Sequence, residues 1–217
     1  MKLISGPLSM YGAKAQIAEL EKNFGAEVEL VGFNLKDRYE PKHPEVIRIH
    51  PKQQVPVLIH DGFDLFDSTQ IFEYFEDIKP EPALWPKDLK QRAIARQLEL
   101  TSDEIFFIKV LSLMPVSRSK QSTEELAATY ASVNQYISNM NDRLKDNDYL
   151  VGDFSYADIA FFVALYFSRF LKVRIPEELT HLFAWRARMT KRDSVYQVMS
   201  TMGAFITSLG LEAPPLD

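Results

Sequence analysis

The sequence predicts an α/β domain over residues 1–78, a linker over residues 79–88 and an all-helical domain over residues 89–217. Three observations support this division. Strand and helix patterns alternate over the first 78 residues in the order βαβαββα. The linker, KPEPALWPKD, contains three prolines, which interrupt regular structure. Beyond it, hydrophobic residues recur at helical spacing and glycines are few.

Short apolar or alternating runs mark the strands of the first domain. They are expected at residues 2–5, 27–31, 55–59 and 63–66. In the second run, Val28 and Leu30 alternate with charged residues, as on a half-buried strand. The last two runs flank Asp61-Gly62, a dipeptide that strongly favours a two-residue hairpin turn.

Helical spacing marks the remaining elements of this domain. A first and a last helix are expected from their apolar residues, Ala13, Ile17, Leu20 and Phe24 in one and Ile71, Tyr74, Phe75 and Ile78 in the other. A short middle helix is expected near residues 45–49.

The second domain is expected to contain long antiparallel helices. The first should run from residue 89 until Pro115 stops it, and residues 123–144 should form its partner. Ser155 and Asp158 stand three residues apart at a helix start, the spacing of a capping box. The helix that follows contains IAFFVALYF, residues 159–167, and should be the buried centre of the domain.

Composition excludes several classes of function. The net charge is −5 and the pI is near 5.5, so we expect no nucleic-acid partner and no membrane partner. The chain has no cysteine and its four histidines lack metal-ligand spacing, so we expect no metal. No signal peptide and no apolar run of the ~20 residues that span a bilayer is visible, which predicts a cytoplasmic protein.

A proline stands inside the predicted third strand. Pro56 removes a hydrogen-bond donor from the strand, which is tolerable where that edge faces a ligand. A cis bond between Val55 and Pro56 would turn the N–H and C=O of Val55 outward, where an extended peptide can pair with them.

Asp67 and Ser68 open the last helix of the first domain. The free amides and positive dipole end of a helix start favour an anion, and Asp67 can hold an ammonium. Together these groups suit the α-amino and α-carboxylate ends of an amino acid. The alternative interpretation of the same pattern is a proline at a sheet edge and an ordinary Asp/Ser helix cap.

These motifs in this order resemble the cytosolic glutathione S-transferase family. They are the Val-Pro pair, the acid-Ser pair, the Pro-rich linker, the helical second domain and the capping-box motif GDFSYAD at residues 152–158. The resemblance covers nearly the whole chain and is greatest to bacterial, serine/theta- or nu-like types. It implies a thioredoxin-like N-terminal domain followed by an all-α domain, a homodimer, and glutathione as co-substrate.

The resemblance also implies roles for individual residues. Val55, before the cis-proline Pro56, would pair with the cysteinyl backbone of glutathione, and Asp67 with Ser68 would hold its γ-glutamyl end. Gln54 stands where the family often has lysine or histidine, and would hydrogen-bond the glycyl end without a charge. That charge would come from Lys42 or His43 instead.

The turn SGPLSMYGAK is expected to carry the chemistry. A tripeptide thiol is a poor nucleophile until its pKa is lowered, and one hydroxyl near the start of the first helix can do this. The segment from Ser9 to Lys14 looks like the Thr/Ser-Pro-Asn-Gly-x-Lys turn of bacterial and fungal relatives, which points to Ser9. Spacing measured from the basic residue, as in theta-like classes, points to Tyr11. We favour Ser9 and keep Tyr11 as the alternative.

The co-substrate is expected to lie between this turn and the second domain. Its plausible walls are Phe106, Phe107, Val110 and Met114, some of which would simply be core. Asp103 is expected to reach the glutathione amino group of the neighbouring subunit, as an acid does in several classes. A mixture of aromatic and charged residues at 72–76 and on the long helix of the second domain, taken as exposed, also supports a homodimer.

The leading hypothesis is a detoxification enzyme that conjugates the glutathione thiolate to a hydrophobic electrophile. Peroxidase, ether-cleaving and dehalogenating reactions stay open. The alternative is a non-catalytic module of the same fold with an interaction, regulatory or ligand-carrier role. Retained ligand groups at Ser9, Val55, Asp67 and Ser68 favour the enzyme.

Overall fold

The computed structural model describes residues 1–216, which form two compact units. Met1–Leu84 and Asp193–Ala213 make up the first, called here the α/β unit. Trp85–Arg192, with the end of the chain from Pro214, makes up the second, called here the helical unit. Each unit is described by itself.

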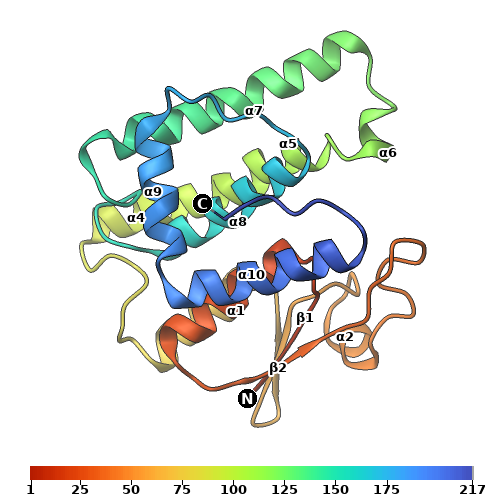
Figure 1. The fold of residues 1–217 in the computed structure, drawn as a ribbon. Coiled ribbons are helices and arrows are strands. Elements are labelled where there is room, and N and C mark those ends of the chain that lie inside the picture. Colours follow the sequence, from red (N-terminus) through yellow and green to blue (C-terminus); the bar gives the residue numbers. More distant parts are fainter. Residues whose placement is uncertain (217) are drawn as a thin grey trace. The chain divides into compact units, whose positions relative to one another are not determined.

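A four-stranded mixed sheet is the framework of the α/β unit (Figure 1). Its strands are β1 (Lys2–Ser5), β2 (Glu27–Leu30), β3 (Val57–His60) and β4 (Phe63–Phe66), in the order β2-β1-β3-β4. β1 pairs with β2 in parallel, whereas β3 is antiparallel to both β1 and β4. The predicted small sheet is therefore confirmed. The hairpin at Asp61-Gly62 is also confirmed, since His60 pairs with Phe63 across it.

Alternating side chains bury both faces of this sheet. Ile4 and Val57 pack with Val46 of α2 (Pro44–Ile49) in one core cluster. Leu3 and Leu58 are adjacent to them in the strands and therefore point to the opposite face. The helices α1 (Met10–Lys22) and α3 (Ser68–Ile78) contact each other as well as the strands.

The aromatic residues within segment 72–76 are not exposed, contrary to the prediction from the sequence. Phe72 and Phe75 are completely buried, and the Phe75 ring lies 5.0 Å from that of Phe24. The prediction that this segment is exposed is wrong, because α3 is amphipathic and its apolar side packs inside the unit.

The last helix, α10 (Asp193–Ser208), belongs to the α/β unit. It packs side by side with α1, and Ser194 donates a hydrogen bond to Glu21 of that helix (Figure 1). The predicted boundaries placed this segment in the helical domain. Val198, Met202 and Ile206 of this helix are buried.

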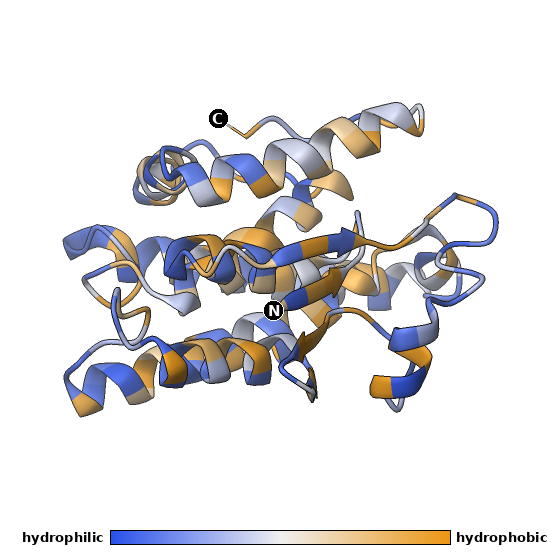
Figure 2. Cartoon of the chain, turned by 90° about the horizontal axis from the view of Figure 1, so that it is seen from below, coloured by the Kyte–Doolittle hydropathy of each residue, from blue (hydrophilic) through white to orange (hydrophobic). Residues whose placement is uncertain are grey.

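The described part of the helical unit is built from six α-helices and two segments of other helical type. They are α4 (Leu89–Thr101), the π-helix η1 (Ser102–Phe107), α5 (Ile108–Leu111), α6 (Pro115–Arg118), α7 (Thr123–Arg143), the 3₁₀ turn η2 (Leu144–Asp146), α8 (Tyr156–Phe170) and α9 (Thr180–Thr190). Hydrophobic and hydrophilic residues alternate in bands along most helices (Figure 2). As expected, α8 is the buried centre, with nearly all of its residues inaccessible to solvent.

The predicted long first helix of this unit is interrupted. It changes from α to π geometry at Ser102 and ends at Leu111, four residues before the predicted stop. Pro115 instead begins α6, where its missing N–H costs nothing. The second long helix is confirmed at Thr123–Arg143.

The predicted capping box at the start of α8 is confirmed. Asp158 is fully buried, and its Oδ2 accepts hydrogen bonds from both the amide and the hydroxyl of Ser155, each at 3.0 Å. Its Oδ1 accepts from the amide of Leu150 and from the indole of Trp185, each at 2.9 Å. This carboxylate therefore ties α8 to the preceding loop and to α9.

Within residues 1–216, none of the helices has the length and apolar character needed to cross a membrane.

Candidate functional site

The strand register brings four connecting segments to one end of the sheet. Ser5, the last residue of β1, pairs with Leu30 at the end of β2, and Ile4 pairs with Val57 at the start of β3. Val57 in turn pairs with Phe66 at the end of β4. The turns after β1, β2 and β4 and the segment before β3 therefore emerge together. They carry all the candidate residues that the sequence places in the first domain.

Ser9 caps the start of α1. Its Oγ accepts a hydrogen bond from the amide of Gly12 at 3.0 Å, and its own amide donates to the carbonyl of Gly6 at 3.0 Å. Because the Oγ lone pair is used in the cap, the hydroxyl proton is available to a thiolate near the helix start. The favoured candidate is thus both a cap and a possible donor, and the two functions are compatible.

Tyr11 lies two residues further along, in the first turn of α1. It is half-buried, and the ammonium of Lys14 lies 5.9 Å from the centre of its ring. Lys14 itself is almost completely buried. The two candidate residues therefore both lie at the start of α1, Ser9 as its N-cap and Tyr11 in its first turn.

Val55 and Pro56 precede β3. The peptide bond between them is cis, and pairing of β3 with β1 begins only at Val57, so Val55 lies outside the ladder. The Val55 side chain packs against the core cluster of Ile4, Val46 and Val57. This packing anchors the residue by its side chain. Gln54, next to it, is exposed.

Asp67 and Ser68 follow β4. Asp67 caps α3, with Oδ1 accepting from the amides of Thr69 at 3.0 Å and Gln70 at 3.1 Å. Its second carboxylate oxygen keeps its capacity for an ammonium, and the residue is exposed, whereas Ser68 is buried. Asp67 has φ 75° and ψ 129°, a conformation that costs of order 1–3 kcal/mol for a residue other than glycine. Such strain is concentrated at functional sites.

His50 is a neighbour of this acidic group that the sequence did not assign to a role. Its ring lies 4.8 Å from that of Phe66. Partial burial lowers the pKa of His50, and the negative charge of Asp67 opposes that shift. The imidazole is therefore a largely neutral group beside the Asp67 carboxylate at neutral pH.

His43 and Lys42, the two candidates for a charge at the glycyl end of glutathione, differ in how many of their polar atoms already have a partner. His43 caps α2 through Nδ1, which accepts from the amide of Glu45, and its Nε2 lies 3.1 Å from Glu29. Lys42 lies 3.3 Å from Glu40 in a single ion pair. Both ring nitrogens of His43 are used, so Lys42 is the more available of the two side chains.

Tyr39 is the residue at this end of the sheet that sequence reasoning missed. It lies in the long loop between β2 and α2, and its hydroxyl accepts a hydrogen bond from the amide of Leu8 at 3.3 Å. No local pattern marks it, because the contact spans 31 positions along the chain. The loop residue thus reaches the turn that carries Ser9.

The remaining candidates lie in the helical unit. Asp103 is buried in η1. Phe106 and Val110 are also buried, and the Phe106 ring stacks on Tyr136 at 4.8 Å and contacts Phe161 at 5.6 Å, so it belongs to the core of this unit. Phe107 is nearly buried, 5.5 Å from the Phe167 ring. Of the four proposed co-substrate walls, only Met114 is half-exposed.

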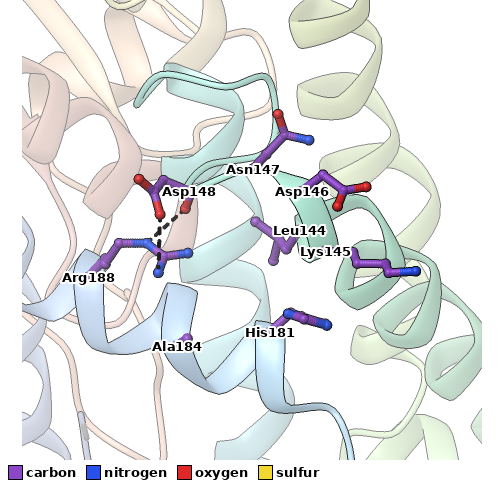
Figure 3. Close-up of a pocket in the computed structure, with 8 residues that line it drawn as sticks. All are labelled: Leu144, Lys145, Asp146, Asn147, Asp148, His181, Ala184 and Arg188. Carbon is purple, nitrogen blue, oxygen red and sulfur yellow. Dashed lines mark hydrogen bonds and ion pairs between the residues drawn. The ribbon is translucent and has the colours of Figure 1, made fainter.

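A polar pocket of about 410 Å³ is also present in the helical unit (Figure 3). It is lined by Leu144, Lys145, Asp146, Asn147, Asp148, His181, Ala184 and Arg188. Arg188 donates to the backbone carbonyl of Asp148 at 2.9 Å and lies 3.5 Å from its carboxylate, which closes one side of the pocket. None of the candidate residues from the sequence lines it.

Among residues 1–216, no cluster of three or more His, Cys, Asp or Glu side chains is placed to hold a metal ion.

Comparison with known protein families is consistent with this arrangement. Residues 3–83 match the family described as "Glutathione S-transferase, N-terminal domain", and residues 103–193 match "Glutathione S-transferase, C-terminal domain". The curated relative "Glutathione S-transferase 2" of Saccharomyces cerevisiae is 29% identical over 209 residues, covering 92% of this chain and 89% of the relative.

Solved structures share the fold. The tau class glutathione S-transferase of mango (Mangifera indica) superposes with a TM-score of 0.81 at 24% identity, covering 96% of this chain and 97% of that one. A theta class glutathione S-transferase from Xanthomonas axonopodis pv. citri, solved with glutathione bound, has a TM-score of 0.74 at 21% identity, covering 90% and 95%. Because the two family matches together span most of the chain, this protein belongs to the glutathione S-transferase family.

Proposed function

We propose that the protein is a cytoplasmic glutathione transferase that conjugates the glutathione thiolate to a hydrophobic electrophile. The observation that carries the proposal is the convergence of Ser9, Val55 and Asp67 at one end of the sheet. They emerge from the adjacent strands β1, β3 and β4, which are about 4.8 Å apart, so the outer two are separated by about 10 Å. An extended tripeptide has about the same length.

Each segment offers a group that complements one part of glutathione. The exposed Asp67 carboxylate has an oxygen left for the α-ammonium of the γ-glutamyl residue. Val55 lies outside the sheet ladder, which leaves its backbone for pairing with the cysteinyl residue. Lys42 and Gln54 are the nearest candidates for the glycyl end.

The reaction requires a thiolate beside the start of α1. The Ser9 hydroxyl would donate a hydrogen bond to the sulfur, and the positive end of the helix dipole favours the same charge. Both effects lower the thiol pKa. The sulfur then forms a bond to an electrophilic carbon, and the leaving group departs with the electron pair of the broken bond, while the thiol proton has already passed to solvent.

Calorimetric titration with glutathione tests the binding site. Asp67→Asn keeps an oxygen for the cap of α3 and removes the charge, so affinity should fall about 10- to 150-fold, as expected for a lost charge-assisted bond of about 1.5–3 kcal/mol. Asp88→Asn is the matched control, because Asp88 caps α4 through the same pair of bonds, to Lys90 and Gln91. Equal affinity in both variants and wild type would place the site elsewhere.

Activity assays against aryl halides, epoxides and hydroperoxides test the reaction class. Turnover of an aryl halide or an epoxide supports the conjugating enzyme. Glutathione binding without turnover of any member of the panel would favour the non-catalytic or carrier alternative.

We also propose that the protein is a homodimer. Leu89, Leu100, Ile105 and Ile108 are between 47% and 76% exposed, and they recur along the continuous helix formed by α4, η1 and α5. An apolar stripe of this kind is typical of an interface. Sedimentation should show a species of about twice the 25.0 kDa chain, and Leu100→Glu should dissociate it. A wild-type monomer at micromolar concentration would contradict the proposal.

A further inference from the structure

Tyr39 makes two contacts with the turn that carries Ser9. Its hydroxyl accepts a hydrogen bond from the amide of Leu8 at 3.3 Å. Its ring covers Gly6 so closely that a Cβ on that glycine would lie 2.7 Å from the Tyr39 Cε1 atom and 2.9 Å from its hydroxyl oxygen. One side chain of a distant loop therefore contacts both ends of the segment Gly6-Pro7-Leu8.

The Leu8 amide needs such a partner. Gly6 to Ser9 form a turn closed by the bond from the Ser9 amide to the Gly6 carbonyl, with Pro7 at the position that proline favours. Leu8 occupies the next position, whose N–H points out of the turn and takes no part in its closing bond. The Tyr39 hydroxyl satisfies this donor from outside, one residue before Ser9.

Aromatic packing inside the α/β unit holds Tyr39 in place. The Phe33 ring, from the same loop, lies edge-on to Tyr39 with centroids 4.9 Å apart. Phe33 also contacts Phe205 of α10 at 6.1 Å. The position of the Tyr39 hydroxyl is thus braced by the loop and the last helix together.

The hydroxyl keeps its proton at neutral pH. Burial raises the pKa of Tyr39 to about 12, although the bond from Leu8 opposes the shift. Tyr39 therefore adds no charge and no titration of its own in the range where a glutathione thiol ionises. Any influence it has on the thiol must be geometric.

We propose that Tyr39 is a positioning residue for Ser9: by holding the Leu8 amide it fixes the turn and so orients the Ser9 hydroxyl toward the bound thiolate. The proposal rests on the proposed glutathione transferase function and adds a residue to its machinery. The orientation matters because a donor displaced by a fraction of an ångström from the developing charge loses much of its effect.

The variant Tyr39→Phe tests this inference, since it keeps the ring over Gly6 and removes only the acceptor of the Leu8 bond. We expect kcat to fall about tenfold and the thiol pKa of bound glutathione to rise, while the glutathione Kd stays close to wild type. Tyr74→Phe is the matched control, because Tyr74 lies in the same unit and bonds His60 instead.

A double-mutant cycle with Ser9→Ala separates positioning from direct action. If Tyr39 acts through Ser9, Tyr39→Phe has no further effect on kcat or thiol pKa in the Ser9→Ala background. Multiplicative losses would overturn the proposal, and so would a Tyr39→Phe enzyme equal to wild type or one whose glutathione Kd rises as much as its kcat falls. A wild-type protein that neither binds glutathione nor lowers its thiol pKa would refute the proposed function and this inference together.

Discussion

Lys22 and Glu76 form a buried ion pair that joins the end of α1 to α3. The Lys22 side chain is completely buried and that of Glu76 is 15% exposed. Lys22 also donates to the backbone carbonyls of Lys79 at 2.8 Å and Pro80 at 3.3 Å. Glu76 accepts from the amide of Leu84. The pair therefore fixes the start of the predicted linker to both helices.

Replacing Lys22 by methionine should destabilise the protein strongly. The change leaves the Glu76 carboxylate and two carbonyls without their cation, and breaking a buried pair by removing one partner costs about 3–5 kcal/mol. Urea unfolding measures the loss. Adding Glu76→Gln to the variant should recover part of it, because the uncompensated charge is then gone. A loss below about 1 kcal/mol in the single variant would contradict the ion pair's role.

The buried Asp158 predicts a pH dependence of stability. Burial raises the pKa of this carboxyl from 3.8 to about 6, against the four hydrogen bonds that lower it. The folded protein then binds more protons at this site than the unfolded chain between about pH 4 and 6. The contribution of Asp158 is therefore fully present below pH 4 and is lost as the pH rises through 6, by about 3 kcal/mol in total.

Comparison with Asp158→Asn isolates this contribution from that of the other carboxylates. The variant should be less stable than wild type at pH 4.5, because its amide group faces the Ser155 amide donor. The difference in the free energy of unfolding should shrink as the pH rises to 7. A difference that grows with pH would mean that the hydrogen bonds outweigh burial and that the carboxylate is ionised in the folded state.

A larger residue at position 6 should be tolerated only if the residue at position 39 is made smaller, because the Tyr39 ring packs directly on Gly6. Gly6→Ala places a methyl group against the braced Tyr39 ring and should cost about 1–3 kcal/mol of stability, the range for overpacking. Tyr39→Leu in the same chain should relieve much of that cost. Urea unfolding of the two single variants and the double variant measures the coupling, and additive losses would show that the ring moves away freely.

Ser9→Ala should act on the thiol and on the cap of α1. The pKa of the bound thiol should rise and turnover should fall about 10²–10³-fold if Ser9 is the main donor. Stability should fall by about 1 kcal/mol because the Gly12 amide loses its acceptor. Absorbance titration of the thiolate measures the first effect. A pKa that rises in Tyr11→Phe and not in Ser9→Ala would assign the role to Tyr11.

The sequence predicted best the features that depend on neighbouring residues. Asp61 and Gly62 both adopt positive φ, which is the reason that this dipeptide favours a hairpin, and no distant contact is needed to infer it. The capping box of Ser155 and Asp158 is local in the same way. Val55, Asp67 and Ser68 could be singled out because each stands beside a proline or a helix start.

The features that were missed depend on distant contacts. The π geometry of η1 has no signature in the sequence, because the same residues form regular α-helices elsewhere. Phe106 and Val110 have the spacing of a helical face, but the spacing does not distinguish a pocket wall from a core residue. Tyr39 lies in a polar, proline-containing loop, and its partners Leu8 and Gly6 are brought to it by the parallel pairing of β1 and β2.

The position of α10 has a consequence for how the chain is made. A ribosome releases the sheet of the α/β unit first, then the helical unit and then α10, so α1 lacks the helix that packs against it until the whole helical unit has been made. A fragment of residues 1–84 would leave that side of α1 exposed to water and to other nascent chains. Recombination that exchanges the helical unit between two genes would likewise need two crossovers, one on each side of that unit. A single crossover within it would separate α10 from α1, the helix it packs against.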